Sequence, residues 1–116
     1  MANKTVVLVT RYGFGSTKPN DEAFGIEMFD TFLHTLESRS EKPEAICFYT
    51  EGVRLVVEGS PMVGSLRLLE GLGVRLVSCK TCLDHYGLLD RVAVGGQGGM
   101  KEIVALMEAA DKVVTV

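Results

Sequence analysis

The chain has 116 residues, a formal charge of −3, 47% apolar residues and 23% charged residues. This composition is typical of one folded domain, here residues 1–116, and excludes a disordered chain. The weakly acidic charge, without a block of lysine and arginine, argues against nucleic-acid and membrane partners. No apolar run is long enough for a signal peptide or a membrane span, so the sequence predicts a cytoplasmic protein.

The first part of the chain predicts a strand, a helix and a second strand. TVVLVT at 5–10 is almost continuously apolar, which is typical of strands that a parallel sheet buries on both faces. Residues 21–38 carry apolar side chains at helical spacing, and Asn20 or Asp21 is placed to cap the first turn. EAICFYT at 44–50 predicts the second strand. The helical stripe consists of Gly25, Phe29, Phe32, Leu33 and Leu36.

The middle of the chain continues this alternation. Residues 60–73 predict a helix in which Ser60 is the N-cap and Pro61 takes the first helical position. VRLVS at 74–78 predicts the third strand. The apolar stripe of this helix consists of Met62, Leu66 and Leu69.

The last quarter of the chain predicts two more strands and one helix. RVAV at 91–94 predicts a short strand, and GGQGG at 95–99 predicts a flexible turn. Residues 99–111 predict the last helix, and KVVTV at 112–116 predicts a further strand buried on both faces. The stripe of the helix consists of Ile103, Val104, Met107 and Ala110.

The alternation of strands and helices predicts a three-layer α/β/α domain with a mostly parallel sheet of four to five strands. In open sheets of this class, ligands and reactive groups gather beyond the carboxyl ends of the strands. These ends are the segments 11–16, 50–52, 79–82 and 95–99.

The three cysteines differ in their expected surroundings. Cys47 lies between Ile46 and Phe48 inside a predicted strand, so we expect it to pack as a small apolar residue. Cys79 and Cys82 follow the third strand at the edge where chemistry is expected. An odd number of cysteines without a secretory signal favours free or catalytic thiols over a disulfide framework.

The CKTC segment places Cys79 and Cys82 beside Lys80 and before a short helical turn. A nearby ammonium group and helix N–H groups both favour the thiolate over the thiol. The thiolate is the species that takes up a sulfane sulfur, exchanges disulfides or binds a metal. These three uses stay open at this point, together with two thiols that have no task.

Two further patterns carry weaker chemistry. Cys79, Cys82 and His85 have the spacing C-x-x-C-x-x-H, which leaves a tetrahedral metal site without its fourth ligand. His85 is also placed to serve as an acid or base near Cys82, because histidine titrates near neutral pH. RYGFGSTKPND at 11–21 could cradle a phosphate on backbone N–H groups, but it lacks the phosphate-loop patterns and is more typical of a tight turn.

Three segments resemble the DsrE-like domain of YedF-type selenium-metabolism proteins, within the DsrE/DsrF/TusD sulfur-relay superfamily. They are FGIEMFDTFLHTLES at 24–38, GVRLVVEGSPMVGSLRLLEGLGV at 52–74 and SCKTCLDHYGLLDRVAVG at 78–95. The resemblance covers essentially the whole chain. Its most specific part is the pairing of VEGSP at 57–61 with CKTCLDHYGL at 79–88.

The resemblance implies a DsrE-like three-layer α/β fold and a cysteine persulfide that is passed to a partner protein. By motif register, Cys82 carries the persulfide, and Cys79 is the extra thiol of the YedF-like branch, with Lys80 and His85 in support. Selenium can replace or accompany sulfur in that branch. Full-length YedF-like proteins have an N-terminal TusA-like domain, so the expectation for this chain is a stand-alone paralogue or a fragment.

The sequence therefore predicts a sulfur or selenium carrier with sulfurtransferase-like chemistry and no resident cofactor or metal. Its expected partners are a sulfur donor or acceptor protein, such as a TusA-like carrier, and further copies of the chain itself. Two alternatives stay open. One is an oligomeric binding module in which the cysteines have no chemical part, and the other is a CxxC redox or metal-binding protein.

Overall fold

The computed structural model describes residues 4–116, which form a five-stranded, wholly parallel sheet with the strand order β4-β3-β2-β1-β5. The central position belongs to β2, and β4 and β5 are the two edges. The strands are β1 (Thr5–Val9), β2 (Ala45–Phe48), β3 (Arg75–Cys79), β4 (Gly96–Gly98) and β5 (Lys112–Thr115).

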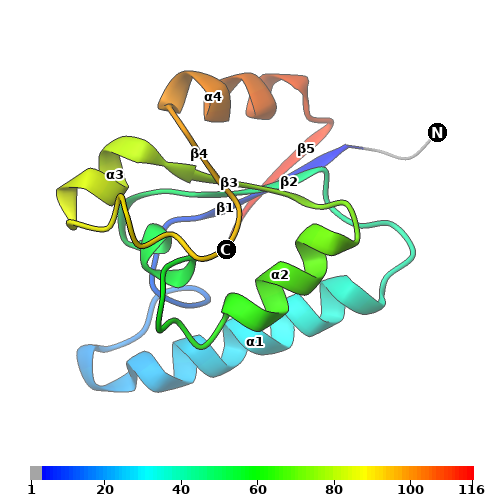
Figure 1. Cartoon of the computed structure of the whole chain (residues 1–116). Helices are drawn as coiled ribbons and strands as arrows, with labels where there is room; N and C mark the ends of the chain where they lie inside the picture. Colours follow the sequence, from blue (N-terminus) through cyan, green and yellow to red (C-terminus); the bar gives the residue numbers. More distant parts are fainter. Residues whose placement is uncertain (1–3) are drawn as a thin grey trace.

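Helices cover both faces of the sheet, which confirms the predicted three-layer α/β architecture. Figure 1 shows α1 and α2 together on one face and α4 across the other, with the short α3 at the carboxyl edge. No helix within residues 4–116 is long and apolar enough to cross a membrane. The helices are α1 (Glu22–Ser38), α2 (Val63–Gly71), α3 (Lys80–His85) and α4 (Met100–Ala109), with the 3₁₀ turns η1 (Pro19–Asp21) and η2 (Thr50–Leu55).

The core lies on both sides of the three inner strands. Val6–Val9, Ala45–Phe48 and Leu76–Cys79 are buried throughout, as a sheet with two helical layers requires. On one face of these strands, the predicted apolar stripes of α1 and α2 supply the buried side chains. Their buried members are Gly25, Phe29 and Leu33 in α1, and Leu66 and Leu69 in α2.

The strand β4, at 96–98, lies inside the segment that the sequence predicts as a flexible turn. The predicted strand at 91–94 instead forms only an isolated antiparallel bridge, between Val92 and Val57. The glycines let the backbone come close to β3, because a Cβ atom added at Gly95 would stand 2.8 Å from the Leu76 Cβ atom. A strand without apolar side chains leaves no hydrophobic pattern to detect.

The predicted burial of the last strand on both faces is wrong. β5 is an edge strand, and Val113 is 41% exposed. In α4, Ile103 is buried as predicted but Val104 is 39% exposed, because only one stripe of that helix reaches the sheet. The β5 edge of the sheet is thus less buried by the rest of the chain than the sequence predicts.

The helix starts also differ from the predicted ones. α2 begins at Val63 rather than at Pro61, although Ser60 still caps the turn locally by accepting a hydrogen bond from the Met62 N–H at 3.1 Å. α1 begins at Glu22, and the side chain of Asp21 makes no capping hydrogen bond. The turn η1 leads directly into α1 in place of a side-chain cap.

Candidate functional site

The two cysteines of the CKTC segment lie where β3 ends and α3 begins, at the carboxyl edge of the sheet. Cys79 is the last residue of β3 and is 2% exposed, because β2 and β4 flank that strand. Cys82 is the third residue of α3 and is partly exposed. Both are free thiols. The site therefore pairs an enclosed thiol with one that solvent reaches.

Thr50, at the end of β2, holds the sulfur of Cys82. Its backbone N–H donates to the Cys82 Sγ atom at 3.1 Å. Thr50 adopts a left-handed conformation with φ +48°, which is uncommon for a β-branched residue. Its hydroxyl donates to the carbonyl oxygens of Thr10, at 2.8 Å, and Tyr49, at 2.7 Å. These side-chain bonds fix a strained backbone in the orientation that aims its N–H at the thiol.

A glycine in η2 allows the segment that follows β2 to approach the end of β1. A Cβ atom added at Gly52 would lie 2.1 Å from the carbonyl oxygen of Val9, so no other residue fits there without a shift of the backbone. The same carbonyl accepts a hydrogen bond from the Tyr49 N–H at 3.1 Å. The chain leaving β2 is therefore pressed against the end of β1, and Thr50 stands between β1 and α3.

Opposing influences set the ionisation of Cys82. Burial raises the pKa of its thiol the most, the adjoining Cys79 thiol raises it further, and the Thr50 N–H lowers it by stabilising the thiolate. The net direction is upward. The sequence predicts that Lys80 favours the thiolate, but its side chain is exposed and the net shift has the opposite sign. At neutral pH the reaction of Cys82 thus depends on a minor thiolate population.

Cys47 has no access to solvent. It lies in β2 with an exposed fraction of 0%, and burial raises the pKa of its thiol to about 11, against a smaller opposing effect of Arg75. A thiol in this setting packs as a small apolar group, as the sequence predicts.

His85 is the last residue of α3, three positions after Cys82. His85 is exposed, and its ring stands edge-on to the ring of Tyr86 with the centroids 4.9 Å apart. Within residues 4–116, no three His, Cys, Asp or Glu side chains gather closely enough to hold a metal ion.

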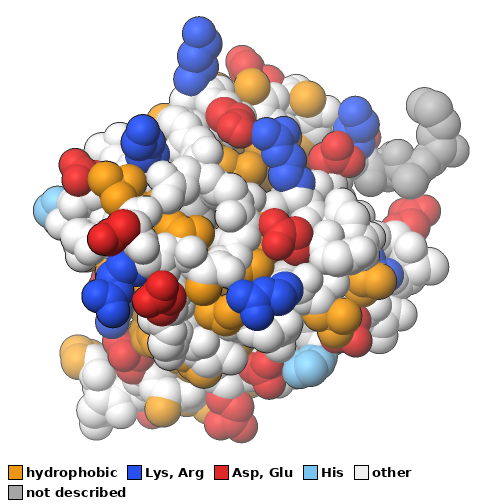
Figure 2. Space-filling model, in the orientation of Figure 1, with side chains coloured by type: hydrophobic (Ala, Val, Ile, Leu, Met, Phe, Trp, Pro, Cys, Tyr) orange, Lys and Arg blue, Asp and Glu red, His pale blue; other side chains and the backbone are white. Residues whose placement is uncertain are grey.

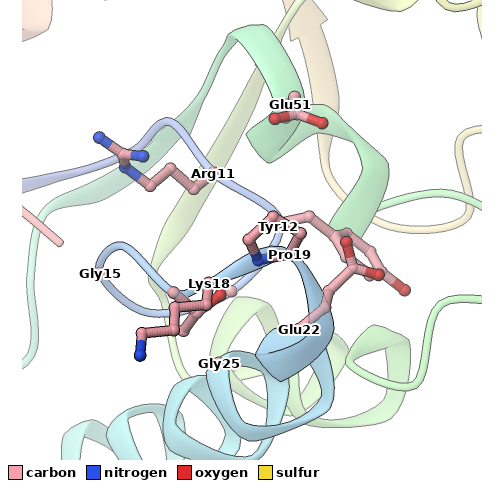
Figure 3. A pocket seen from close by; sticks show the side chains of 10 residues that line it. Arg11, Tyr12, Gly15, Lys18, Pro19, Glu22, Gly25 and Glu51 are labelled. Carbon is pink, nitrogen blue, oxygen red and sulfur yellow. The ribbon is translucent and has the colours of Figure 1, made fainter.

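A small polar cavity opens at the carboxyl end of β1 (Figure 3). Its volume is about 130 Å³, and its walls come from the 11–19 loop, the start of α1 and Glu51 of η2. The loop lies against α1 because the Phe14 N–H donates to the carbonyl oxygen of Gly25 at 3.0 Å. The segment predicted as a tight turn is thus one wall of a cavity.

Sequence reasoning identifies 50–52 as a strand end but misses the role of Thr50. Its contribution is a backbone N–H, which every residue but proline possesses, so the residue type gives no signal. The only available hint is the glycine two residues later, at the end of an apolar strand.

Figure 2 shows acidic and basic side chains interspersed on the face in view, without a broad region of one charge sign.

Comparisons with solved structures place the fold among known proteins. The chain matches the crystal structure of the ychN protein from E. coli, which has a DsrE/DsrF-like fold, with a TM-score of 0.73 and 20% identity over 99% of this chain and 100% of that one. It also matches MTH1491 from Methanobacterium thermoautotrophicum, a protein of unknown function (TM-score 0.69, 18% identity, 99% of this chain and 100% of that chain).

A third match is BT1422 from Bacteroides thetaiotaomicron, a conserved protein of unknown function (TM-score 0.67, 13% identity, 97% of this chain and 95% of that chain). No family model matches the sequence, and no curated protein is significantly similar to it. At these identities the likeness establishes the fold alone, and it confirms the DsrE-like fold that the sequence predicts.

Proposed function

We propose that this chain, which shares its fold with the ychN protein, is a carrier that takes up a sulfane sulfur as a persulfide on Cys82 and passes it to a partner protein. The observation that supports the proposal most directly is the setting of the Cys82 Sγ atom. It is partly exposed, lies 3.1 Å from the Thr50 N–H, and stands next to a second, enclosed thiol.

The uptake step is a thiol exchange on sulfur. The Cys82 thiolate attacks the outer sulfur of a donor persulfide, R–S–SH, and the S–S bond of the donor breaks. Cys82 then carries S–SH, and the donor leaves as the thiolate R–S⁻. The Thr50 N–H stabilises the attacking anion, which offsets part of the rise that burial causes in the pKa of Cys82.

Release follows one of two routes. A thiolate of the partner, such as a TusA-like carrier, attacks the outer sulfur, so that the S–S bond on Cys82 breaks, the partner carries that sulfur as its own persulfide, and the Cys82 thiolate is restored. Without a partner, the Cys79 thiolate attacks the inner sulfur, HS⁻ leaves, and a Cys79–Cys82 disulfide remains until an external dithiol reduces it. If selenium replaces the outer sulfur, the same bonds form and break in uptake and release.

Mass spectrometry tests this function. Purified protein is incubated with a cysteine desulfurase and cysteine, and we expect an adduct of about 32 Da, one sulfur atom, on Cys82 that a dithiol removes. Cys82→Ser should lose the adduct, and Cys47→Ser serves as the matched control that keeps it. A folded protein that gains no adduct on Cys82 would overturn the proposal.

The rival with an observation in its favour is a binding module that uses the cavity at the end of β1 and not the cysteines. The double variant Cys79→Ser, Cys82→Ser separates the two functions in cells. The carrier proposal requires loss of function in the double variant. A double variant that still supports function assigns the role to the binding module.

Self-association is part of the proposal. By strand register, Val113 points to the same face of the sheet as Arg75, whose guanidinium binds Glu102 of α4 at 2.7 Å. The ten-residue helix α4 lies across this face of the five-stranded sheet (Figure 1), and Val104 and Val113 remain about 40% exposed. We expect a second copy of the chain to cover them. Size-exclusion chromatography with light scattering should show an oligomer, and a monomer at all concentrations would contradict this part.

A further inference from the structure

The cavity at the end of β1 carries charge of both signs on opposite walls. Figure 3 shows Arg11 and Lys18 on one side, Glu22 on the other, and Glu51 at the top. Glu51 is partly neutralised, because Arg54 lies 3.4 Å from its carboxylate. Among the described residues Glu22 makes no ion pair, so its carboxylate is available to a ligand.

The part of the cavity that its walls surround has the size of a small metabolite. An engineered protein cavity of about 150 Å³ binds benzene, which has six heavy atoms, so a space of about 130 Å³ admits a molecule of roughly that size. The walls here are mostly charged and polar groups, which require a ligand that pairs with them. A small molecule with one positive and one negative group meets both conditions.

The cavity and the thiol site share neighbouring residues. Glu51 follows Thr50, whose N–H holds the Cys82 sulfur. Arg11 follows Thr10, whose carbonyl accepts the Thr50 hydroxyl at 2.8 Å. Two walls of the cavity are therefore joined through the backbone to the residues that position Cys82.

We propose that this cavity binds a free α-amino acid with a short sulfur-bearing side chain, of the cysteine class. Arg11 and Lys18 receive its carboxylate, and Glu22 receives its ammonium group. The inference rests on the proposed function for the role of the ligand: the amino-acid persulfide is the donor R–S–SH, the Cys82 thiolate takes its outer sulfur, and the amino acid leaves as its thiolate. Binding itself requires no sulfur transfer.

The test uses S-methyl-L-cysteine, which has both charges but no thiol, so binding is measured apart from transfer. Amide shifts of the ¹⁵N-labelled full chain are followed during titration into the millimolar range. We expect saturable shifts at Gly13, Gly15 and Gly25, with binding about tenfold or more weaker in Arg11→Gln and in Glu22→Gln. Arg39→Gln, which removes a cation far from this cavity, is the matched control and should bind as the wild type does.

Two analogues test the zwitterion requirement. The methyl ester lacks the carboxylate and the N-acetyl derivative lacks the ammonium group. The affinity of each for the cavity should be lower than that of S-methyl-L-cysteine by a factor of about ten or more. Equal binding of thiosulfate and S-methyl-L-cysteine would make the cavity a general anion site and overturn the inference. Shifts outside the cavity, or none, would overturn it as well.

The two proposals fail separately. Binding of S-methyl-L-cysteine to a chain that gains no persulfide on Cys82 would refute the carrier function and leave the amino-acid site standing. A persulfide formed on Cys82 from a protein donor, without amino-acid binding in the cavity, would refute the site and leave the carrier function standing.

Discussion

The middle of β2 and the first turn of α3 each hold a cysteine, and burial raises the pKa of both thiols. Cys47 has no exposed surface, and the charge of Arg75 offsets the effect of its burial only in small part. Cys82 is partly exposed, and the Thr50 N–H at 3.1 Å works against the effect of burial. The enclosed thiol lies inside a strand, whereas the reachable thiol lies beyond the end of one. At the ends of parallel strands, backbone N–H groups are not all used by the sheet and can bind a side chain.

The largest expected effect is the loss of all persulfide formation in Cys82→Ser. Serine keeps the shape of the site but removes the nucleophile, so the adduct on this position should disappear. Cys47→Ser should load as the wild type does, because its thiol is enclosed. Native-state labelling with iodoacetamide at neutral pH provides a second measurement, and labelling of Cys47 ahead of Cys82 would reverse the comparison.

Replacement of Gly52 tests how much the close approach of η2 to the end of β1 contributes to stability. In Gly52→Ala the new methyl group would meet the Val9 carbonyl oxygen, and we expect a loss of about 3 kcal/mol in the free energy of unfolding. Urea denaturation measures it. Gly64→Ala in α2 is the matched control, because no atom lies within 4 Å of that added Cβ, and it should be neutral or slightly stabilising. Equal stability of the two variants would contradict the account.

The buried thiol predicts a pH dependence of stability. The pKa of Cys47 is about 11 in the folded chain and 9.0 without the protein environment, so its stabilising contribution is complete below about pH 9 and is lost as the pH rises through 11. Two pH units correspond to about 3 kcal/mol at most. Cys47→Ala should lack this part of the decline between pH 9 and 11, as measured by urea denaturation at each pH. Identical pH profiles would refute the assignment.

The smallest effect concerns the hydroxyl of Thr50. Thr50→Gly keeps the N–H and permits positive φ, but it removes the hydrogen bonds to Thr10 and Tyr49 that fix the orientation. We expect alkylation of Cys82 at pH 7 to slow about two- to fivefold, the range of a partly lost hydrogen bond. Thr50→Ser keeps the hydroxyl and should react at nearly the wild-type rate. A Gly variant as fast as wild type would show that the hydroxyl does not position the donor.

The sequence was sufficient for the fold class and for most of the elements, because helical and strand periodicities are local signals. The strand β4 escaped detection since glycines leave no periodicity, and the exposure of β5 depends on the strand order rather than on its own residues. The sequence also predicts the position of Cys79 and Cys82 at the carboxyl edge of the sheet, where the structure has them. It could not reveal Thr50 as the partner of Cys82, because a backbone N–H and a positive φ are properties of the assembled chain.

The bridging position of Thr50 has a consequence for the order of folding. Its hydrogen bonds join residues 40 positions apart, to Thr10, and 32 positions apart, to Cys82. Contacts this distant in sequence close late, after the loops between them have collapsed. A chain emerging from the ribosome therefore presents Cys82 as an ordinary exposed thiol, and the contact between its sulfur and the Thr50 N–H forms only when β1, β2 and α3 have assembled.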